Sequence, residues 1–209
     1  MSFDNTKSTD HLVAQPLFMM MIGLPHSGKT AIAHEIRKQE RRHTVIVSAK
    51  VIRNKLRHTT AKSIFQEARK EIIAHLRQGH NVILDATNID AGARKTTTEQ
   101  AKEFTDKIIG IFVDTPLPVC IENYKRSHSH SYSKTQAERI KRMDKQLKKG
   151  RNKPCQAGPH SGFAEIRHYI WESGRFTIKI LHPPICTRPP HKKGGGEKTK
   201  DHYLEHIAS

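Results

Sequence analysis

The chain has 209 residues, of which 37 are Lys or Arg and 20 are Asp or Glu, so its formal net charge is +17. Hydrophobic residues make up 35% and charged residues 27%, a composition that argues against a wholly disordered chain and permits one domain with a sizeable core. No run of about 18 apolar residues occurs, which excludes a membrane-spanning helix, and the basic excess favours a polyanionic partner such as nucleic acid.

The predicted elements alternate between strands and helices along most of the chain. Short apolar runs indicate buried strands, and apolar residues at helical spacing indicate helices. In chain order we expect a strand at 17–22, a helix at 30–39, strands at 44–47 and 81–84 on either side of a helix at 60–78, a helix at 91–104, a strand at 108–113, helices at 116–126 and 134–149, and a strand at 176–181. This alternation predicts a three-layer α/β fold with a mostly parallel sheet.

Three segments of the chain differ in composition. Residues 1–14 are expected to form a flexible leader, residues 15–182 a single domain with a helical lid at about 123–153, and residues 183–209 a basic tail that contains Pro and Gly. The leader lacks the apolar core of a signal peptide, and the three cysteines are far apart with no C-x-x-C pair. We therefore expect a cytoplasmic chain without a disulfide.

The most informative motif is Gly23-Leu24-Pro25-His26-Ser27-Gly28-Lys29-Thr30, which fits the pattern G-x-x-x-x-G-K-[ST]. A predicted buried strand precedes it and a predicted helix follows, as a phosphate-binding loop requires. The loop amides are expected to hold phosphate, Lys29 to bridge the β- and γ-phosphates, and the Thr30 hydroxyl to bind Mg²⁺. ATP is favoured over GTP because Asn54-Lys55-Leu56-Arg57 lacks the Asp of the base-reading sequence N-K-x-D.

Asp85 directly follows the apolar strand at 81–84. Ligands of open α/β sheets bind beyond the carboxyl ends of the strands, so this carboxylate is predicted to help hold Mg²⁺. The alternative is a turn or helix-capping aspartate.

The segment Asp85-Ala86-Thr87-Asn88 resembles the D-x-T-N segment of P-loop kinases of the polynucleotide-kinase type. Arg94 falls where that family often carries an arginine, and the segments 120–126 and 138–143 resemble its lid. Pro154 followed by Gly162-Phe163-Ala164-Glu165-Ile166 resembles the family's closing element, with Ser161 and Ala164 in place of its acids. The resemblance extends over about residues 17–181.

This resemblance implies transfer of the γ-phosphate of ATP to a hydroxyl, usually a polynucleotide 5′-end. It also implies that Thr87, Asn88 and Arg94 line the acceptor or phosphate side, the alternative being helix capping by Thr87 or Asn88 and a surface position for Arg94. A lid arginine is expected to stabilise the transferring phosphoryl group, with Arg126 the first candidate and Arg139 and Arg142 the next. For each arginine the alternative is a solvated basic face.

The chain departs from the family pattern at the residue that is expected to act as general base on the acceptor hydroxyl. The family carries an aspartate in a D-x-x-R pattern after its second strand, and here the stretch contains Arg53 but has Lys50 at the aspartate position. A general base contributes about 10²–10⁴-fold, so its loss need not abolish transfer. Either Asp85 acts as the base, or the chain is a weak or differently directed kinase, or it binds nucleotide and RNA without transfer. Lys50 could itself contact acceptor phosphate.

Three functional hypotheses follow. The first is an ATP- and Mg²⁺-dependent kinase of polynucleotide 5′-hydroxyls, RNA or DNA, in nucleic-acid repair. The second is a small-molecule kinase of the same fold, against which the +17 charge argues. The third is a nucleotide-dependent nucleic-acid-binding protein with a degenerate kinase site. Phe163 and Trp171 are predicted to be core residues rather than base-stacking platforms.

Overall fold

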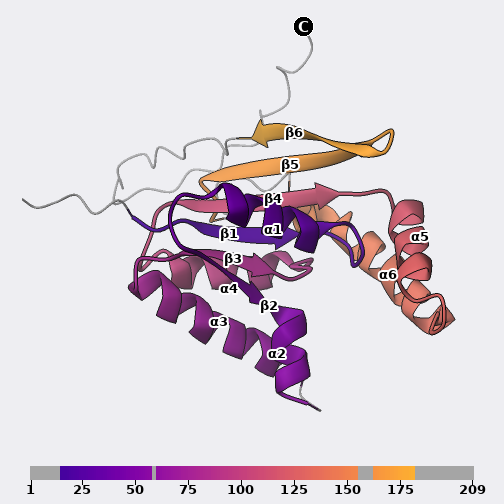
Figure 1. Ribbon diagram of the computed structural model, residues 1–209, viewed down its shortest axis with the longest axis horizontal. Helices are drawn as coiled ribbons and strands as arrows, with labels where there is room; N and C mark the ends of the chain where they lie inside the picture. Colours follow the sequence, from indigo (N-terminus) through magenta and orange to yellow (C-terminus); the bar gives the residue numbers. More distant parts are fainter. Residues whose placement is uncertain (1–14, 58–59, 155–161, 182–209) are drawn as a thin grey trace, which may run out of the picture.

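The computed structural model describes residues 15–57, 60–154 and 162–181. The predicted leader at 1–14 and tail at 183–209 lie outside these residues, as do Cys155, Ser161 and Cys186. The described part of the chain has the predicted fold class: helices lie on both sides of a mostly parallel sheet (Figure 1).

A six-stranded sheet forms the middle layer, with strand order β2-β3-β1-β4-β5-β6. The strands are β1 Phe18–Ile22, β2 Thr44–Ser48, β3 Asn81–Asp85, β4 Ile108–Asp114, β5 Glu165–Glu172 and β6 Arg175–Leu181. The strands from β2 to β5 are parallel, and β6 runs antiparallel to β5. The carboxyl ends of the parallel strands therefore meet at one edge of the sheet, where ligands of such sheets bind.

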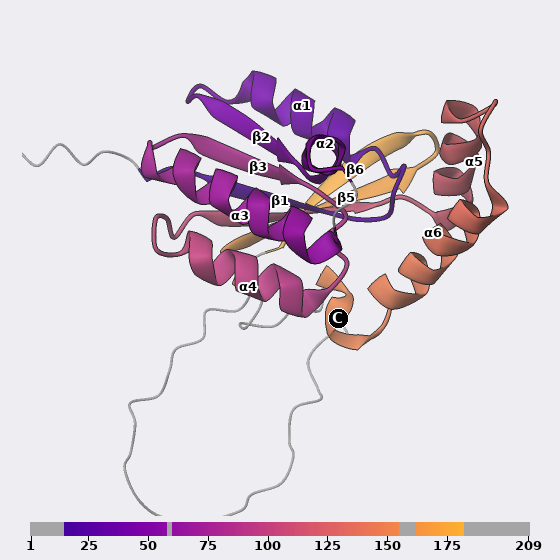
Figure 2. The same cartoon turned by 90° about the horizontal axis from the view of Figure 1, so that it is seen from below.

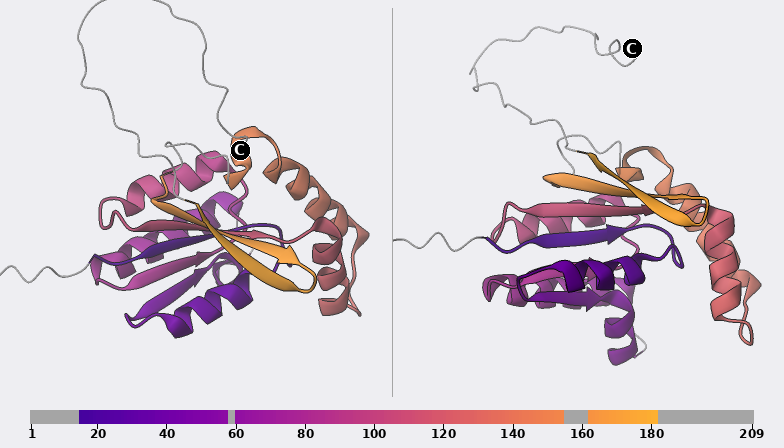
Figure 3. Two further views of the ribbon diagram at one scale, coloured as in Figure 1. Left: turned by 90° about the horizontal axis from the view of Figure 1, so that it is seen from above. Right: turned by 45° about the horizontal axis from the view of Figure 1, so that its top comes forward.

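The helices cover the two faces of the sheet and its carboxyl edge (Figure 2, Figure 3). They are α1 Lys29–Gln39, α2 Ala49–Lys55, α3 Ala61–Arg77, α4 Ala91–Ala101, α5 Leu117–Ser127 and α6 Lys134–Leu147, followed by the 3₁₀ turn η1 Gly150–Asn152. Figure 2 shows α1 on one side of the sheet and α3 and α4 next to each other on the other side. The pair α5 and α6 stands beyond the carboxyl ends of the strands, where both views in Figure 3 also place it.

The sheet has a hydrophobic core on each of its two faces. Strand β1 contributes to both cores, because its side chains alternate between the faces of the sheet. Phe18, Met20 and Ile22 pack in the cluster that includes the apolar stripe of α3, whereas Met19 and Met21 pack in the cluster that includes α1. All five residues are fully buried, so β1 has helices over both faces and an uninterrupted apolar sequence. Each such side chain contributes about 1.5–3 kcal/mol through burial.

Polar residues define where the helices begin. The Thr60 side chain accepts a hydrogen bond from the Ser63 amide at 3.2 Å, which caps the start of α3. The Asp90 carboxylate likewise accepts from the Ala93 amide at 2.8 Å and caps α4. Such caps satisfy amides that have no partner inside the helix.

Two elements of the structure were not predicted from the sequence. The short helix α2 begins directly after β2, and strand β5 covers a stretch that the sequence analysis assigned only to a closing element. In β5 the polar pair Arg167-His168 separates Ile166 from a short run at 169–171, and Ile166 is its one buried residue, so no long apolar run marks the strand. A signal was present in Ser173-Gly174, where both residues have positive φ (49° and 85°) in the tight turn between β5 and β6.

The prediction that Trp171 is a core residue is wrong, whereas Phe163 lies in the core as predicted. Trp171 is only partly buried, because the β5–β6 hairpin lies at the edge of the sheet (Figure 1). Its ring packs against Phe176 on the neighbouring strand, with ring centroids 4.8 Å apart.

Cys120 is free and buried, and because the other two cysteines lie outside the described residues, the expectation of no disulfide stays a prediction. Burial raises the pKa of its thiol to about 11, so the reactive thiolate is scarce at neutral pH. No helix in the described ranges combines the length and the apolar composition that crossing a membrane requires.

Three histidines meet at the end of the sheet opposite the phosphate loop. The His80 ring lies 4.5 Å from that of His43 and 5.7 Å from that of His75. Burial, followed by the charges of His43 and His75, lowers the pKa of His80. A lowered pKa means that folding favours the neutral ring, so stability is retained at neutral pH and lost as pH falls below about 6.5, the pKa of an unperturbed His.

We therefore expect the melting temperature to fall between about pH 7.5 and pH 5.5, and to fall less in His80→Gln. Differential scanning calorimetry of both proteins at each pH measures the difference. His34→Gln, an exposed histidine on α1, is the control and is expected to leave the wild-type pH response unchanged. An equal fall in wild type and His80→Gln would contradict the role of this cluster.

Candidate active site

The phosphate loop joins β1 to α1 at the carboxyl edge of the sheet (Figure 1). Gly23 has a φ of 146°, and a Cβ there would lie 2.6 Å from the Val113 carbonyl oxygen, so only glycine fits between the loop and β4. The Gly23 amide donates to the Thr87 carbonyl oxygen at 3.0 Å, which ties the loop to the segment after β3. Gly28, with a φ of 97°, makes the turn into α1.

Lys29 lies inside the loop that precedes it. Its ammonium group is almost fully buried and donates hydrogen bonds to the Leu24 carbonyl and, at 3.2 Å, to Ser27 Oγ. Burial lowers the pKa of Lys29 to about 8, an effect that the negative charge of Asp85 partly opposes. The loop thus holds a desolvated cation, and such a cation is stabilised when an anion joins it.

Thr30 and Asp85 meet at the start of α1. The Thr30 hydroxyl donates a hydrogen bond to Asp85 Oδ2 at 2.8 Å, although the two residues are 55 positions apart in the chain. Asp85 is buried at the end of β3, whereas Thr30 is exposed. A hydroxyl and a carboxylate offer the hard oxygen donors that Mg²⁺ prefers, so this pair fits the predicted magnesium site.

Asn88 connects the segment after β3 to the strand that carries the phosphate loop. Its side-chain amide donates to the Met21 carbonyl oxygen at 2.7 Å, and its backbone has a φ of 45°. The left-handed conformation suits Asn better than most residues. Asn88 is buried and bonded to β1, an arrangement that positions the loop; contact with an acceptor stays a prediction for Asn88 and for the partly buried Thr87.

Arg94 is buried beneath the same segment instead of lying at the surface. One guanidinium nitrogen donates to the Asn88 and Ile89 carbonyl oxygens at 2.9 and 2.8 Å, and the other terminal nitrogen donates to the Asn152 carbonyl oxygen at 3.1 Å. Burial lowers the pKa of Arg94 to about 10, and Asp90 partly opposes this shift. These contacts describe a residue that positions the segment 88–89, and direct contact with an acceptor stays a prediction.

Lys50 and Arg53 are exposed on α2, which begins where β2 ends at the carboxyl edge of the sheet. Burial, and then the charges of His128, Lys29 and Lys50, lower the pKa of His26 in the phosphate loop. Arg53 has no ion pair or side-chain hydrogen bond within the described ranges. The structure therefore brings Lys50 into the field of the phosphate loop, and an acceptor role for either residue stays a prediction.

The lid contacts the phosphate loop through α5. Asn123 donates to the His26 carbonyl oxygen at 3.1 Å, and Arg126 in turn donates to Asn123 Oδ1 at 2.9 Å. Arg126 is thus linked to the loop only through Asn123, and its side chain is exposed. Arg139 and Arg142 are also exposed, on α6, and no contact with the loop links them to it. The arrangement favours Arg126 among the candidates for the predicted lid arginine.

Several contacts of the loop could not be read from the motif. The His26 ring lies 5.1 Å from that of Tyr124 and 5.4 Å from that of His128, and the Thr115 hydroxyl donates to the Ser27 carbonyl oxygen at 2.8 Å. Burial, followed by the charge of His128, lowers the pKa of His26. No sequence spacing links these residues to the loop, because they lie in or next to α5, far along the chain from it.

The aromatic hairpin also reaches the loop. A Cβ at Gly28 would meet the Phe176 ring at 3.6 Å, so β6 lies beside the start of α1. The sequence did not predict this contact, because Gly28 and Phe176 lie near opposite ends of the domain along the chain.

The comparisons with known proteins agree with this architecture. The AAA_33 model, described as an AAA domain, matches residues 18–149. No curated protein matches the chain. Among solved structures, the Pnkp1/Rnl/Hen1 RNA repair complex is similar with a TM-score of 0.55 and 24% identity, over 63% of this chain and 44% of that one. The chain therefore spans less than half the length of that relative.

Two further structures have the same fold at lower identity. The PezAT toxin–antitoxin system of Streptococcus pneumoniae matches with a TM-score of 0.55 and 15% identity, over 75% of this chain and 69% of that one. The Mycobacterium tuberculosis APS kinase CysC in complex with AMPPNP and APS matches with a TM-score of 0.50 and 17% identity, over 58% and 75%. The family match extends over more than half of the 209 residues, so the chain belongs to the AAA_33 family and carries a P-loop kinase-like domain.

Proposed function

We propose that this chain is an ATP-dependent phosphotransferase whose acceptor is the 5′-hydroxyl of a polynucleotide, RNA or DNA. The observation that carries the proposal is the bond between Thr30 and Asp85 at 2.8 Å, directly beside the buried Lys29 ammonium. These groups bring a phosphate-binding cation and a pair of hard oxygen donors to the same edge of the sheet. The net charge of +17 supports a polyanionic acceptor over a small metabolite.

In the proposed reaction the acceptor oxygen forms a bond to the γ-phosphorus, the bond from that phosphorus to the bridging oxygen breaks, and ADP leaves. Lys29 holds the β- and γ-phosphates, and the loop amides orient them. Mg²⁺ held by Thr30 and Asp85 would neutralise charge on these phosphates. Arg126 supplies positive charge from the lid, where Asn123 holds its guanidinium near His26. The proton of the acceptor passes to a base, for which Asp85 is the candidate carboxylate, or to solvent.

The proposal is tested by incubation with Mg²⁺ and ATP labelled at the γ-phosphate, together with RNA or DNA that ends in a 5′-hydroxyl. We expect label to appear on the oligonucleotide, and none when the 5′-end is already phosphorylated. ADP release with a metabolite and not with any oligonucleotide would identify a small-molecule kinase. Absence of transfer to every acceptor, over a range of metals and pH, would overturn the phosphotransferase proposal.

A nucleotide-dependent nucleic-acid-binding function is the second candidate, and Lys50 favours it. At the position where the related kinases have an aspartate base, this chain has an exposed ammonium on α2, which begins at the carboxyl edge of the sheet. An ammonium group is protonated at neutral pH and cannot accept the proton of the acceptor hydroxyl.

The substitution Lys50→Asp distinguishes the two candidates. We expect slow transfer by the wild type and a kcat higher by about 10²-fold in Lys50→Asp, because the new carboxylate supplies a general base. Lys55→Asp, also an exposed lysine on α2, is the matched control and is expected to leave kcat near the wild-type value. Single-turnover transfer of labelled phosphate gives the rates. If neither wild type nor Lys50→Asp transfers phosphate, the binding function is favoured.

A further inference from the structure

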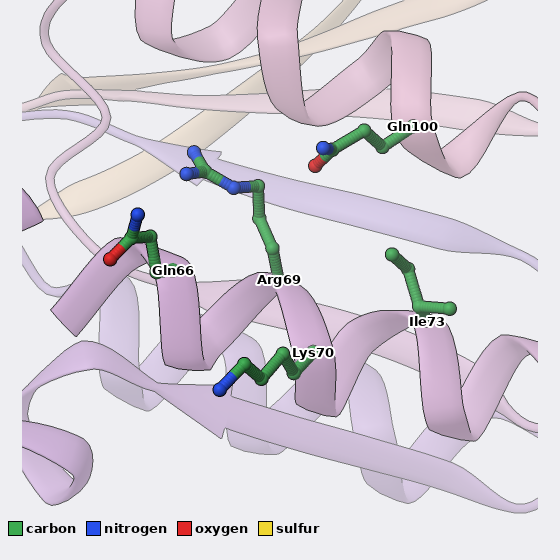
Figure 4. A pocket seen from close by; sticks show the side chains of 5 residues that line it. All are labelled: Gln66, Arg69, Lys70, Ile73 and Gln100. Atoms are coloured by element: carbon green, nitrogen blue, oxygen red, sulfur yellow. The ribbon is translucent and has the colours of Figure 1, made fainter. Parts of the chain in front are cut away.

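An open groove of about 500 Å³ lies between α3 and α4, and it is lined by Gln66, Arg69, Lys70, Ile73 and Gln100 (Figure 4). These two helices cover the face of the sheet opposite to α1 (Figure 2). None of the lining residues belongs to the phosphate loop or to the lid, so the groove is a separate feature of the surface.

The side of α3 that borders the groove is basic. Lys62, Gln66, Arg69, Ile73 and Arg77 follow one another at intervals of three or four residues, so they share one side of the helix. None of the five is acidic. Arg69 is partly buried, and its guanidinium forms no ion pair or hydrogen bond with the described residues. The groove thus contains a cation that has no anionic partner in the part of the chain that the structure describes.

The ion pairs beside the groove leave this charge largely intact. Glu67 lies 3.2 Å from Lys70, and the Lys70 side chain remains 77% exposed. On α4, Glu99 is 3.6 Å from Lys95. Exposed pairs of this kind are worth about 0.2–1 kcal/mol and open readily for a stronger anion. Arg69 and Lys70 together therefore present positive charge to a ligand in the groove.

Gln100 sets a second requirement for a ligand of the groove. Its Oε1 atom is buried and has no hydrogen-bond partner within the described residues, so its amide must turn toward the groove to accept a hydrogen bond from a ligand. Figure 4 shows its side chain extending from α4 into the same space as Arg69. An acceptor atom without a donor costs free energy when it is buried, and a ligand that brings a donor removes this cost. The groove therefore suits a ligand that has both negative charge and a hydrogen-bond donor.

We propose that this groove binds single-stranded RNA, with backbone phosphate on Arg69 and Lys70 and a ribose 2′-hydroxyl donating to Gln100 Oε1. RNA has the required charge and donor in every nucleotide, and its 2′-hydroxyl is what distinguishes it from DNA. The chain's net charge of +17 complements such a ligand. The proposal concerns binding alone and does not depend on transfer at the phosphate loop.

The proposed contact between backbone phosphate and the two cations is tested with the double substitution Arg69→Ala/Lys70→Ala. Fluorescence anisotropy without ATP gives the Kd for a labelled single-stranded RNA at several salt concentrations. We expect the Kd to rise about 5- to 10-fold, and the slope of log K against log salt to fall by about 1.4, since each lost phosphate contact removes about 0.7. Arg37→Ala/Lys38→Ala is the matched control: it removes the same charge from α1, where Lys38 pairs with Glu35 at 3.6 Å in the same i, i+3 arrangement.

The proposed preference for RNA over DNA is tested with Gln100→Met, which removes the acceptor oxygen and keeps the length of the side chain. We expect wild type to bind RNA about 3- to 10-fold more tightly than DNA of the same sequence, and Gln100→Met to bind the two alike. The melting temperature should not fall, because Gln100 Oε1 has no described partner to lose.

Two outcomes would overturn the proposal. One is an equal loss of RNA affinity in the α1 control, which would show that only net charge matters. The other is an RNA-to-DNA affinity ratio that Gln100→Met leaves unchanged, which would reduce the groove to a DNA- or phosphate-binding surface. Both are independent of the proposed transfer, which is measured separately with ATP labelled at the γ-phosphate.

Discussion

The substitution Lys29→Ala is expected to lower phosphoryl transfer by about 10³-fold or more and to leave the fold intact. The Lys29 ammonium is buried within the loop, where it bonds to the Leu24 carbonyl and to Ser27 Oγ, and no other lysine occupies the loop. Without it, the charge of the β- and γ-phosphates has no fixed cation from the loop itself. Relief of the cost of burying this cation offsets the loss of its two hydrogen bonds, so the melting temperature should stay near the wild-type value.

Transfer of labelled phosphate and the ATP Kd from calorimetry measure this effect, and circular dichroism reports on the fold. Lys38→Ala is the control, because Lys38 is an exposed lysine on the same helix and is expected to leave transfer unchanged. Transfer that persists in Lys29→Ala would show that the phosphate loop is not where the reaction occurs. The pKa of about 8 adds a pH effect: above that value the free protein loses the Lys29 proton, so initial ATP binding should weaken.

The substitution Arg94→Met is expected to lower the free energy of unfolding by about 2–4 kcal/mol, which corresponds to about 5–15 °C in melting temperature. The guanidinium satisfies the carbonyl oxygens of Asn88, Ile89 and Asn152 at 2.8–3.1 Å in a buried position. Methionine retains much of the volume and leaves these oxygens without their donor. Because Asn88 also bonds to β1, the segment behind the phosphate loop is expected to loosen.

Chemical denaturation of wild type, Arg94→Met and Lys95→Met measures the effect. Lys95 is the next residue on α4 and is exposed, with Glu99 3.6 Å away, so its substitution should change stability by less than about 0.5 kcal/mol. If Arg94→Met kept full stability and lost only affinity for the acceptor, the positioning role would be wrong and the direct acceptor role would be supported.

The phosphate loop and the alternation of buried strands with helices are the features that the sequence predicted most completely. Both are local: the motif occupies Gly23–Thr30, and the strands β1 and β3 are uninterrupted apolar runs with Asp85 at the end of the second. Strand β5 was missed because polar residues interrupt its apolar ones, and α2 because it is only 7 residues long. Trp171 was misplaced because an aromatic residue near an apolar run says nothing about whether its strand lies at the edge of the sheet.

The sequence by itself determined the parallel α/β class, the phosphate loop and the strong basic charge, since each depends on residue type and on spacing within a short segment. Only the tertiary structure decided that Arg94 is buried against Asn88 and Asn152, and that Asn123 connects Arg126 to His26. It also decided that Arg69 and Gln100 line one groove. These are contacts between segments distant in the chain, and their partners depend on how the helices pack on the sheet, which no local pattern records.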